Sequence, residues 1–326
     1  MSKILITGGA GYIGSNTART LRLRGYDVMV VDDLSRGHEH NVRDVPFRRL
    51  NLSQTSELTE LLQTERCDAV VHFAAYIAVG ESTQRPELYF SNNVGGTLSL
   101  LAAMVAANVK HLVFSSTAAV YGIPQLVPIP EDSPYAPVSP YGESKLIVEK
   151  VLRWMDECRG LRSIALRYFN ACGADPRSTL GEEHDPETHL IPLLLRAVKT
   201  GKPVTIFGAD YETPDGTCIR DYIHIADLAE AHVLALEHLM KGGRSEAFNV
   251  GTGTGHSVME VVRAVKEVTG IEVPYTVGPR REGDAAILVA NSTKLQRTLG
   301  WQPKYPDVRK MVETAWRFEK ERRPAE

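Results

Sequence analysis

Tyr141 and Lys145 lie four residues apart in the segment Ser139-Pro140-Tyr141-Gly142-Glu143-Ser144-Lys145. Ser139 is suited to cap a helix and Pro140 to its first turn, so the spacing predicts Tyr141 and Lys145 on one helical face. A tyrosine of pKa about 10 is a poor base at neutral pH, but a cation about 5 Å away at an effective dielectric of about 20 favours the phenolate by about 3 kcal/mol, roughly two pKa units. The pair is therefore a candidate for proton transfer, although this spacing alone is also typical of a surface pair.

Hydroxyl groups follow the predicted strand His111–Ser115, in the run Ser115-Ser116-Thr117. A hydroxyl at the carboxyl end of a strand lies where ligands of parallel α/β sheets bind. Thr117 is therefore a third candidate catalytic residue.

Glycines fill the segment Gly8-Gly9-Ala10-Gly11-Tyr12-Ile13-Gly14, between a predicted strand, Ile4–Thr7, and a predicted helix, Ser15–Arg24. They permit a tight turn and let backbone N–H groups approach a pyrophosphate, which the helix N-terminus attracts. Asp32 ends the next predicted strand about 20 residues further on, where its carboxylate can accept hydrogen bonds from an adenosine ribose and repel a 2′-phosphate. A glycine motif alone is weak evidence, but this order of elements predicts NAD rather than NADP. Oxidised nicotinamide would add a second positive charge that favours a phenolate.

The elements that must position these residues are read from an alternation of β-branched runs with helical stretches in the first half of the chain. The predicted strands are Ile4–Thr7, Val28–Asp32, Ala69–His72, His111–Ser115 and Ser163–Arg167. Alternation implies a parallel sheet with crossover helices, and runs that are apolar throughout imply a sheet covered on both faces. The predicted fold class is α/β, a Rossmann-type doubly wound parallel sheet.

The pattern changes after Asn170, where Pro176, Pro186 and Pro192 break the chain into short pieces. We place the start of a smaller α/β substrate domain there. The predicted NAD-binding domain is 1–170, with 218–245 returning to it, and the predicted substrate domain is 171–217 with 246–326.

Two helices of the predicted substrate domain have cap signals. Ser257 and Glu260 have the spacing of a capping box, and Gly270 is suited to end that helix. Asp307 is suited to cap the last helix of the chain.

Composition points to a small partner. The 326 residues, 43% of them hydrophobic, suffice for one large domain and a smaller one. The net charge of −3 is spread without basic or acidic blocks, so neither nucleic acid nor an anionic membrane is an expected partner. No run approaches the roughly 18 apolar residues that a membrane span needs.

Cysteine and histidine spacing bear on the compartment and on metals. The four cysteines are far apart, which predicts neither a disulfide framework nor a Cys-x-x-Cys metal site, and the chain start lacks the features of a signal peptide. We therefore expect a cytoplasmic protein. The spacings of His72, His189 and His224 suggest no metal cluster, so no metal site is predicted.

With these motifs in order, the chain resembles the extended short-chain dehydrogenase/reductase family and, within it, the UDP-galactose 4-epimerases. The likeness covers nearly the whole chain, and the order of the matching segments makes it specific. Those segments are Thr7–Ser15, Val30–Leu34, His72–Ala75, Val79–Ser82, Phe114–Gly122, Tyr141–Lys145, Arg167–Asn170, Ile206–Asp210, Asp215–Asp227 and Arg281–Asp284.

The resemblance implies NAD as the cofactor. Tyr141 would be the acid/base, Lys145 would hold the nicotinamide ribose and lower the tyrosine pKa, and Thr117 would hydrogen-bond the sugar hydroxyl. The expected cofactor-binding residues are Gly8, Gly11, Tyr12, Ile13, Gly14, Asp32, Asn51, Leu52, Phe73, Ala74, Ala75, Tyr141, Lys145 and Tyr168.

The same resemblance implies a UDP-sugar substrate. Asn170 and the strand Ile206–Gly208 would contact the UDP moiety. Arg220 and Arg281 would bind its phosphates, since a diphosphate needs fixed cations and arginine binds it in bidentate geometry, and Asp284 would lie near the nucleotide ribose. The expected substrate-binding residues are Thr117, Asn170, His189, Leu190, Ile206, Phe207, Arg220, Arg281, Asp284 and Leu288.

Two positions depart from the family pattern. Asn51 stands where many relatives carry an acid that contacts the adenine amino group, and its side-chain carbonyl can still accept that bond. Ile77 stands where relatives often carry Lys, so a cationic contact near the cofactor is missing.

Ala118 and Ala119 bear on the expected reaction. In the family, the tyrosine takes the C4 hydroxyl proton while hydride passes from C4 to NAD. Relatives that dehydrate or decarboxylate the sugar carry acidic residues directly after Thr117, where this chain has two alanines. Re-reduction after rotation of the sugar then gives the C4 epimer without net consumption of NAD. The alternatives are a 4-epimerase of UDP-pentose or UDP-glucuronate, and a non-catalytic NAD-binding regulator, which the intact Tyr141, Lys145 and Thr117 argue against.

Leu288 bears on substrate range. In similar epimerases this position borders the sugar pocket, where a tyrosine crowds the 2-position and smaller residues admit an acetamido group. Leu288 therefore implies dual activity on UDP-galactose and UDP-N-acetylgalactosamine, unless it is a core residue of a strand, Ile287–Ala290. The resemblance also implies a homodimer, formed through the Tyr141 helix and the apolar helix Val94–Ala107.

Overall fold

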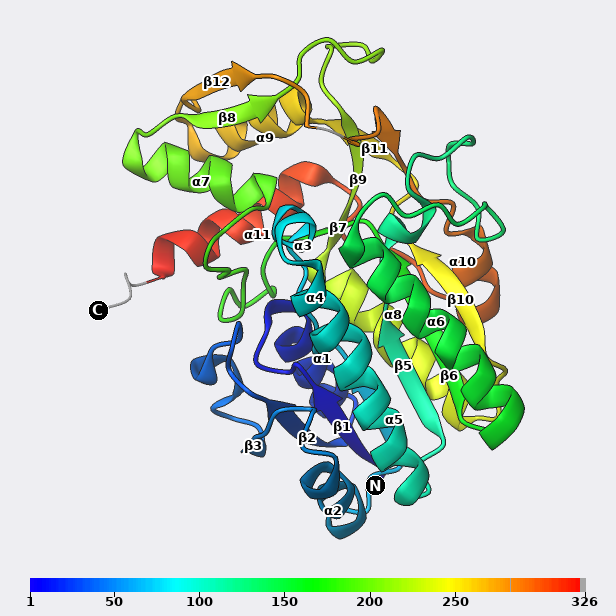
Figure 1. Cartoon of the computed structure of the whole chain (residues 1–326). Coiled ribbons are helices and arrows are strands. Elements are labelled where there is room, and N and C mark those ends of the chain that lie inside the picture. The colour runs from blue at the N-terminus through cyan, green and yellow to red at the C-terminus, as the bar shows by residue number, and fades with distance from the viewer. Residues whose placement is uncertain (282, 323–326) are drawn as a thin grey trace.

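The computed structural model describes residues 1–281 and 283–322. Within that part of the chain, seven parallel strands form one sheet in the order β10-β6-β5-β4-β1-β2-β3 (Figure 1). The strands are β1 (Lys3–Thr7), β2 (Asp27–Asp32), β3 (Phe47–Arg49), β4 (Ala69–His72), β5 (His111–Ser115), β6 (Arg162–Tyr168) and β10 (Glu246–Val250). All five predicted strands lie in this sheet, and the predicted α/β class is confirmed.

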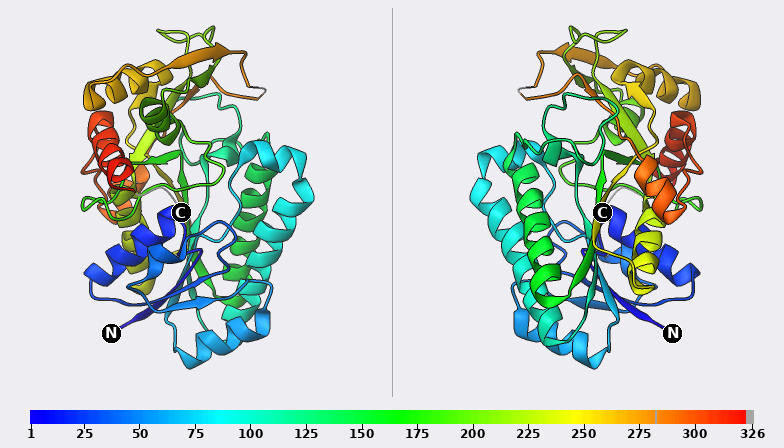
Figure 2. Two further views of the ribbon diagram at one scale, coloured as in Figure 1. Left: turned by 90° about the vertical axis from the view of Figure 1, so that its left-hand side faces the viewer. Right: turned by 90° about the vertical axis from the view of Figure 1, so that its right-hand side faces the viewer.

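Helices cover both faces of the sheet, as Figure 2 shows edge-on. One face is covered by α1 (Tyr12–Leu23), α8 (Ile225–Met240) and α10 (Thr293–Leu299), and the other by α2 (Thr55–Thr64), α5 (Gly96–Ala106) and α6 (Pro140–Arg159). Side chains on both faces of β1 are therefore buried: Ile4 and Ile6 belong to one core and Leu5 to the other. This double cover explains why the strands are apolar throughout.

Short helices connect the longer elements near the strand ends. They are a 3₁₀ helix (Glu39–Val42), α3 (Val79–Gln84), α4 (Pro86–Tyr89), a π-helix (Phe90–Gly95) and a second 3₁₀ helix (Ala118–Tyr121). The π-helix runs directly into α5, so the apolar segment predicted as one helix over Val94–Ala107 begins in a wider turn.

A second domain lies beyond the carboxyl ends of the sheet strands (Figure 1). Its strands are β7 (Asn170–Cys172), β9 (Ile219–His224), β11 (Gly255–Ser257) and β13 (Ile287–Leu288) in one sheet, and β8 (Val204–Phe207) paired with β12 (Tyr275–Gly278). Its helices α7 (Leu190–Thr200), α9 (Val258–Thr269) and α11 (Val308–Glu321) share one apolar core with these strands. The predicted capping box of Ser257 with Glu260 and the Asp307 cap are both present.

The predicted domain boundaries need one correction. We assigned 218–245 to the first domain and 246–326 to the second. Instead β9 pairs with strands of the second domain, whereas β10 pairs with β6 at the edge of the large sheet. The returning segment is therefore α8 and β10. Sequence alone could not show this, because a short apolar strand does not reveal which sheet edge it will join.

Candidate active site

The glycine segment forms a tight turn between β1 and α1. Gly8 has φ +71°, and a β-carbon there would lie 2.4 Å from the Ala74 nitrogen. A β-carbon on Gly14 would lie 2.3 Å from the Gly8 oxygen, so both positions exclude a side chain. Gly11 begins α1 without a side-chain cap, which leaves the first N–H groups of the helix free of side-chain acceptors. The turn thus has the form of a pyrophosphate site.

Asp32 ends β2 beside this turn. Its two carboxylate oxygens accept hydrogen bonds from the backbone N–H groups of Ala10 (3.0 Å) and Leu34 (2.9 Å). Burial raises the pKa of Asp32, and these N–H groups oppose the rise. Each oxygen keeps acceptor capacity for a ribose hydroxyl, since a carboxylate has about four lone-pair positions.

Asn51 differs from expectation. Its side-chain oxygen already accepts from the Ser53 nitrogen (3.0 Å) and the Ser53 hydroxyl (2.7 Å), and its amide donates to Asp33 (2.6 Å). An amide oxygen has two lone pairs, so the acceptor that we expected for the adenine amino group is occupied within the chain. The neighbouring Leu52 is buried in the core beneath α5.

The segment after β4 lies against the glycine turn. The Phe73 and Ala74 backbone contacts Gly8, as the β-carbon distances above require. Ala75, also predicted for the cofactor, is half-buried and precedes Tyr76, whose backbone exchanges two hydrogen bonds with the Asn93 side chain.

Two other predicted cofactor residues face the second domain or the core. The Tyr12 hydroxyl donates to the Gly173 oxygen (2.6 Å) and so joins α1 to the second domain. Ile13, the next residue, packs against the core beneath α1. Ile77, which stands where relatives often carry Lys, is exposed.

Tyr141, Lys145 and Thr117 come together at the carboxyl end of β5. Ser139 caps α6 by accepting from the Gly142 nitrogen (3.2 Å), which places Tyr141 and Lys145 in the first turns, where both are buried. Thr117 caps the 3₁₀ helix that follows β5, and its side chain lies close enough to Tyr141 to oppose the rise in that residue's pKa. The predicted catalytic residues are thus neighbours.

The protonation of this pair differs from expectation. Burial raises the pKa of Tyr141, and the hydrogen bond with Thr117 only partly opposes this. Burial also lowers the pKa of Lys145 to about 7, against the opposing charge of Glu149. We expected Lys145 to lower the pKa of Tyr141. In the protein without bound cofactor, however, desolvation disfavours both the tyrosinate and the lysine ammonium.

Ser115 and His232, which we did not predict as site residues, lie beside the predicted cofactor residue Tyr168. The Ser115 hydroxyl lies 2.6 Å from the Tyr168 hydroxyl, and its carbonyl accepts from Lys145. The His232 ring lies 4.7 Å from the Phe73 ring and 6.3 Å from the Tyr168 ring, measured between centroids. Ser115 stood in the hydroxyl run, which was a usable signal, but His232 lies on α8 with no local signal.

The predicted phosphate and ribose contacts form two pairs in the second domain. Arg220 on β9 donates to Asp284 (2.6 Å), and the Arg281 guanidinium lies 4.2 Å from the centroid of the Phe207 ring. Ile206 is buried beside Phe207 in β8. Glu282, between these residues, lies outside the described residues. The structure thus brings together five of the residues predicted to hold the nucleotide.

Asn170, His189 and Leu190 line one small cavity, together with Glu182. The Asn170 amide donates to the Asp221 backbone oxygen (3.1 Å), which holds β7 beside β9. Leu288 on β13 lies elsewhere: it is half-buried and packs against the core of Ala118 and its neighbours, directly after Thr117.

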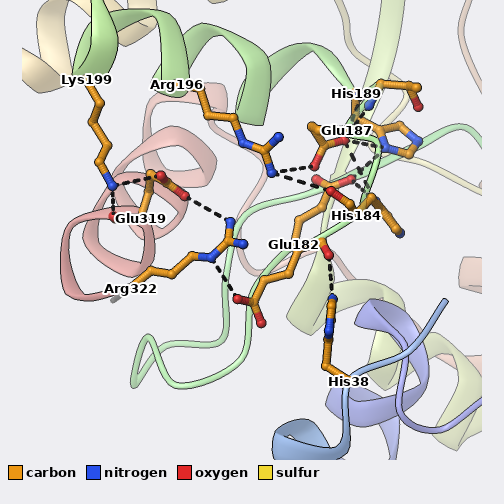
Figure 3. Close-up of polar contacts among 11 residues, drawn as sticks. His38, Glu182, His184, Glu187, His189, Arg196, Lys199, Glu319 and Arg322 are labelled. Atoms are coloured by element: carbon orange, nitrogen blue, oxygen red, sulfur yellow. Dashed lines mark hydrogen bonds and ion pairs between the residues drawn. The ribbon is translucent and has the colours of Figure 1, made fainter. Parts of the chain in front are cut away.

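The loop before α7 holds a cluster that spacing alone did not predict. Glu182, His184, Glu187 and His189 place potential metal-ligating atoms within 4.8 Å of one another (Figure 3). Burial disfavours the charged imidazoles, but the carboxylates outweigh this and raise the pKa of both histidines. We predicted no cluster because the three histidines considered were far apart in sequence, whereas His189 joins one through residues of its own loop.

Comparison with known proteins agrees with this geometry. Residues 4–251 match the NAD dependent epimerase/dehydratase family. The chain belongs to this family. A UDP-glucose 4-epimerase from Lactobacillus helveticus is 50% identical over 320 residues, covering 98% of this chain and 97% of the relative.

Solved structures of family members extend the likeness to the fold. The UDP-glucose 4-epimerase of Brucella ovis, solved in complex with NAD, is 45% identical, with a TM-score of 0.95 and 98% coverage of both chains. The enzyme of Bifidobacterium longum, solved with NAD⁺ and UDP, is 35% identical, with a TM-score of 0.93 and 98% coverage of both chains.

The family's cofactor, NAD, fits the residues of this chain. Gly8 and Gly14 close a turn that no side chain could enter, α1 starts without a side-chain cap, and Asp32 stands at the end of the next strand. These three features together suit a dinucleotide.

Proposed function

We propose that this family member interconverts UDP-glucose and UDP-galactose by inverting carbon 4 through a transient 4-keto sugar. NAD, when bound, supplies the acceptor and donor of the C4 hydride. The residues of the chain bind and orient the sugar and move the proton of its C4 hydroxyl.

The placement of Tyr141 and Thr117 beside each other at the carboxyl end of β5 carries this proposal. A sugar hydroxyl that inserts between the two side chains can donate its proton to the Tyr141 oxygen while the Thr117 hydroxyl fixes its position. Return of the same proton completes the reverse step, so Tyr141 ends the cycle in its starting state. Both residues are buried, which excludes bulk water from the transfer.

Lys145 supports the phenolate form of Tyr141 indirectly. Its Nζ is held at the carboxyl end of β5 by the Ser115 carbonyl (2.9 Å) and lies 4.9 Å from the centroid of the Phe114 ring. With a pKa of about 7, Lys145 changes charge easily near neutral pH. A protonated Lys145, together with the positive charge that oxidised nicotinamide would supply when bound, would favour the tyrosinate.

Acidic groups beyond Thr117 bear on the fate of the keto sugar. Ala118 and Ala119 offer no acid or base. Glu149 reaches this region, but its carboxylate is bound by the Ser116 hydroxyl (2.5 Å) and by Arg167. A carboxylate engaged in this way is a poor base for carbon acids, which favours re-reduction over elimination.

The second domain supplies groups for the UDP moiety. Arg220 and Arg281 are cations suited to a diphosphate, and the half-buried Phe207 ring lies against the Arg281 guanidinium. Phosphates would draw Arg220 away from Asp284, which then becomes free to accept from a ribose hydroxyl.

The test is to supply purified protein with UDP-galactose and follow UDP-glucose by chromatography while recording nicotinamide absorbance. We expect conversion to the equilibrium mixture with no net change of NADH. Turnover of UDP-pentose or UDP-glucuronate alone would move the substrate assignment to those sugars. Release of one NADH for each sugar converted would contradict epimerisation altogether.

Two further assignments concern the assembly and the compartment. Exposed Leu98 on α5 and Trp154 on α6 lie on the same side of the sheet and support a homodimer formed by these helices.

All four cysteines are free, which supports a reducing compartment and hence the cytoplasm. No helix in the described residues is long and apolar enough to cross a membrane.

A further inference from the structure

The loop between β7 and α7 carries four side chains that converge on one point. Glu182, His184, Glu187 and His189 lie within eight consecutive positions of the sequence. Figure 3 shows the two imidazoles and the two carboxylates facing each other at the start of α7. One potential ligand atom from each lies within 4.8 Å of the others.

The separations between these atoms bracket those around a small metal ion, and the two shortest are of hydrogen-bond length. The Glu182 Oε1 lies 3.1 Å from the His184 Nδ1 and 2.7 Å from the His189 Nδ1. The Glu187 Oε1 lies 3.8 Å and 3.3 Å from the same two nitrogens. A tetrahedral zinc ion with bonds of about 2.0–2.1 Å separates its ligand atoms by about 3.3–3.4 Å, within the range of these four distances.

Hydrogen bonds within the cluster leave polar atoms without partners. The His189 Nδ1 is buried and makes no hydrogen bond of acceptable geometry, although the Glu182 oxygen is only 2.7 Å away. The Glu187 side chain is fully buried, and its Oε2 also lacks a hydrogen-bond partner. The nearest arginine, Arg196, remains 3.9 Å from that oxygen. Buried carboxylates that lack such partners are costly, and a cation offsets that cost.

We propose that Glu182, His184, Glu187 and His189 bind one divalent transition-metal ion of the zinc class. Two imidazoles with two carboxylates suit zinc or cobalt, whereas magnesium and calcium prefer oxygen ligands throughout. The Glu187 Oε1 accepts from the Thr188 nitrogen (2.8 Å) and the His189 nitrogen (2.9 Å), which fixes the carboxylate at the start of α7, while its Oε2 has no hydrogen-bond partner.

The proposed ion would hold the loop before α7 in place and would take no part in the epimerisation step. His189 is the residue from which α7 begins, and Glu182, His189 and Leu190 line the cavity beside Asn170. A bound ion therefore fastens the loop to α7 and fixes this wall of the cavity. The Tyr141 site belongs to α6, a separate element, so the amount of bound zinc can be measured whether or not the protein epimerises a UDP-sugar.

The test measures metal in the full-length protein. The purified protein is treated with a chelator, exchanged into metal-free buffer and incubated with zinc chloride, and bound zinc is counted by mass spectrometry after gel filtration. We expect about one zinc ion per chain, a higher melting temperature with zinc, and visible absorption typical of tetrahedral cobalt when Co²⁺ replaces it.

Three variants locate the site. Loss of a residue that only hydrogen-bonds to a metal ligand weakens metal affinity by roughly 10- to 100-fold. His184→Ala and Glu187→Gln each remove a proposed ligand, so each should weaken zinc binding by more than that. His40→Ala is the matched control, because its imidazole contacts Glu183 in the same loop but lies outside the cluster. It should bind zinc as the unaltered protein does. Circular dichroism and bound NAD report whether each variant folds.

The opposing explanation is that protonated histidines alone neutralise the two glutamates. In that case the unaltered protein binds neither zinc nor cobalt stoichiometrically, and zinc leaves the melting temperature unchanged, which overturns the proposal. Equal binding by His184→Ala, Glu187→Gln and the unaltered protein would also overturn it. If both variants fail to fold, the cobalt spectrum of the unaltered protein decides, because an octahedral spectrum contradicts this site.

Discussion

Lys145 donates a hydrogen bond of 2.9 Å to the carbonyl oxygen of Ser115, the last residue of β5. The lysine side chain therefore crosses from α6 to the sheet and ends where the hydroxyl run begins. Its ammonium is buried, and this carbonyl is its one hydrogen-bond acceptor among the described residues; desolvation lowers its pKa.

This burial predicts a pH dependence of stability in protein freed of nucleotide. The pKa of Lys145 is about 7 in the folded chain against 10.5 for an unperturbed lysine. The unfolded chain therefore binds more protons between these values, so the free energy of unfolding should rise from about pH 7 to about pH 10, by a few kcal/mol at most. Urea denaturation at several pH values measures this. Lys145→Met should flatten the rise, whereas the exposed Lys150→Met should not; equal slopes in both would contradict the prediction.

Replacement of the proposed base gives a second prediction. Tyr141→Phe keeps the ring but removes the proton acceptor, so turnover of UDP-galactose should fall by at least about 100-fold while folding and NAD content persist. Tyr135→Phe, at an exposed tyrosine, is the control and should keep nearly full turnover. Activity close to that of the unaltered protein in Tyr141→Phe would remove the assignment.

Asp32 should set the choice of cofactor. A 2′-phosphate would meet its carboxylate without a compensating cation, so we expect the protein to bind NAD much more tightly than NADP. Asp32→Asn keeps an oxygen for the Ala10 nitrogen and removes the charge, so the ratio of the two affinities should fall at least about 10-fold. Calorimetric titration of nucleotide-free protein measures the affinities for NAD and for NADP. Asp44→Asn, a substitution at an exposed aspartate, is the control. Tight NADP binding by the unaltered protein would refute this role.

Arg220 should contribute to nucleotide binding. Arg220→Ala removes a cation proposed for the diphosphate and should weaken UDP binding by about 10- to 100-fold, which corresponds to about 1.4–2.8 kcal/mol. The comparison is Arg153→Ala, an exposed ion pair on α6. The phosphate-binding role would be wrong if both variants bound UDP equally well.

Leu288 should govern the size of the group at the sugar 2-position. Its place beside Ala118 and its neighbours suits a pocket wall next to Thr117. We expect the unaltered protein to epimerise UDP-N-acetylgalactosamine as well as UDP-galactose. Leu288→Tyr should lower kcat/KM for the N-acetylated sugar more than for UDP-galactose, by a difference of about 1–3 kcal/mol in transition-state free energy. Equal losses for the two substrates, or absence of N-acetyl activity before mutation, would defeat the prediction.

Much of the fold could be predicted because its signals are local. The apolar runs located five of the strands in the large sheet, and the caps at Ser139, Ser257 and Asp307 located the helix starts. A helix cap or a glycine turn depends on residues within a few positions of each other, so a short stretch of sequence is enough to predict it. β3 was missed because a three-residue strand has too short a pattern.

The pairing of Tyr141 with Lys145, the glycine turn and Asp32 were determined by the sequence, because spacing on one helix and the order of strand, turn and helix fix them. Only the tertiary structure decided which edge of the large sheet β10 joins. It also decided that the Asn51 side-chain oxygen accepts from Ser53, and that four side chains between Glu182 and His189 converge in one cluster. The tertiary structure also decided the direction in which burial shifts the pKa values of Tyr141 and Lys145. Protonation depends on desolvation by residues distant in sequence, and no spacing along the chain records how much water the packed side chains exclude.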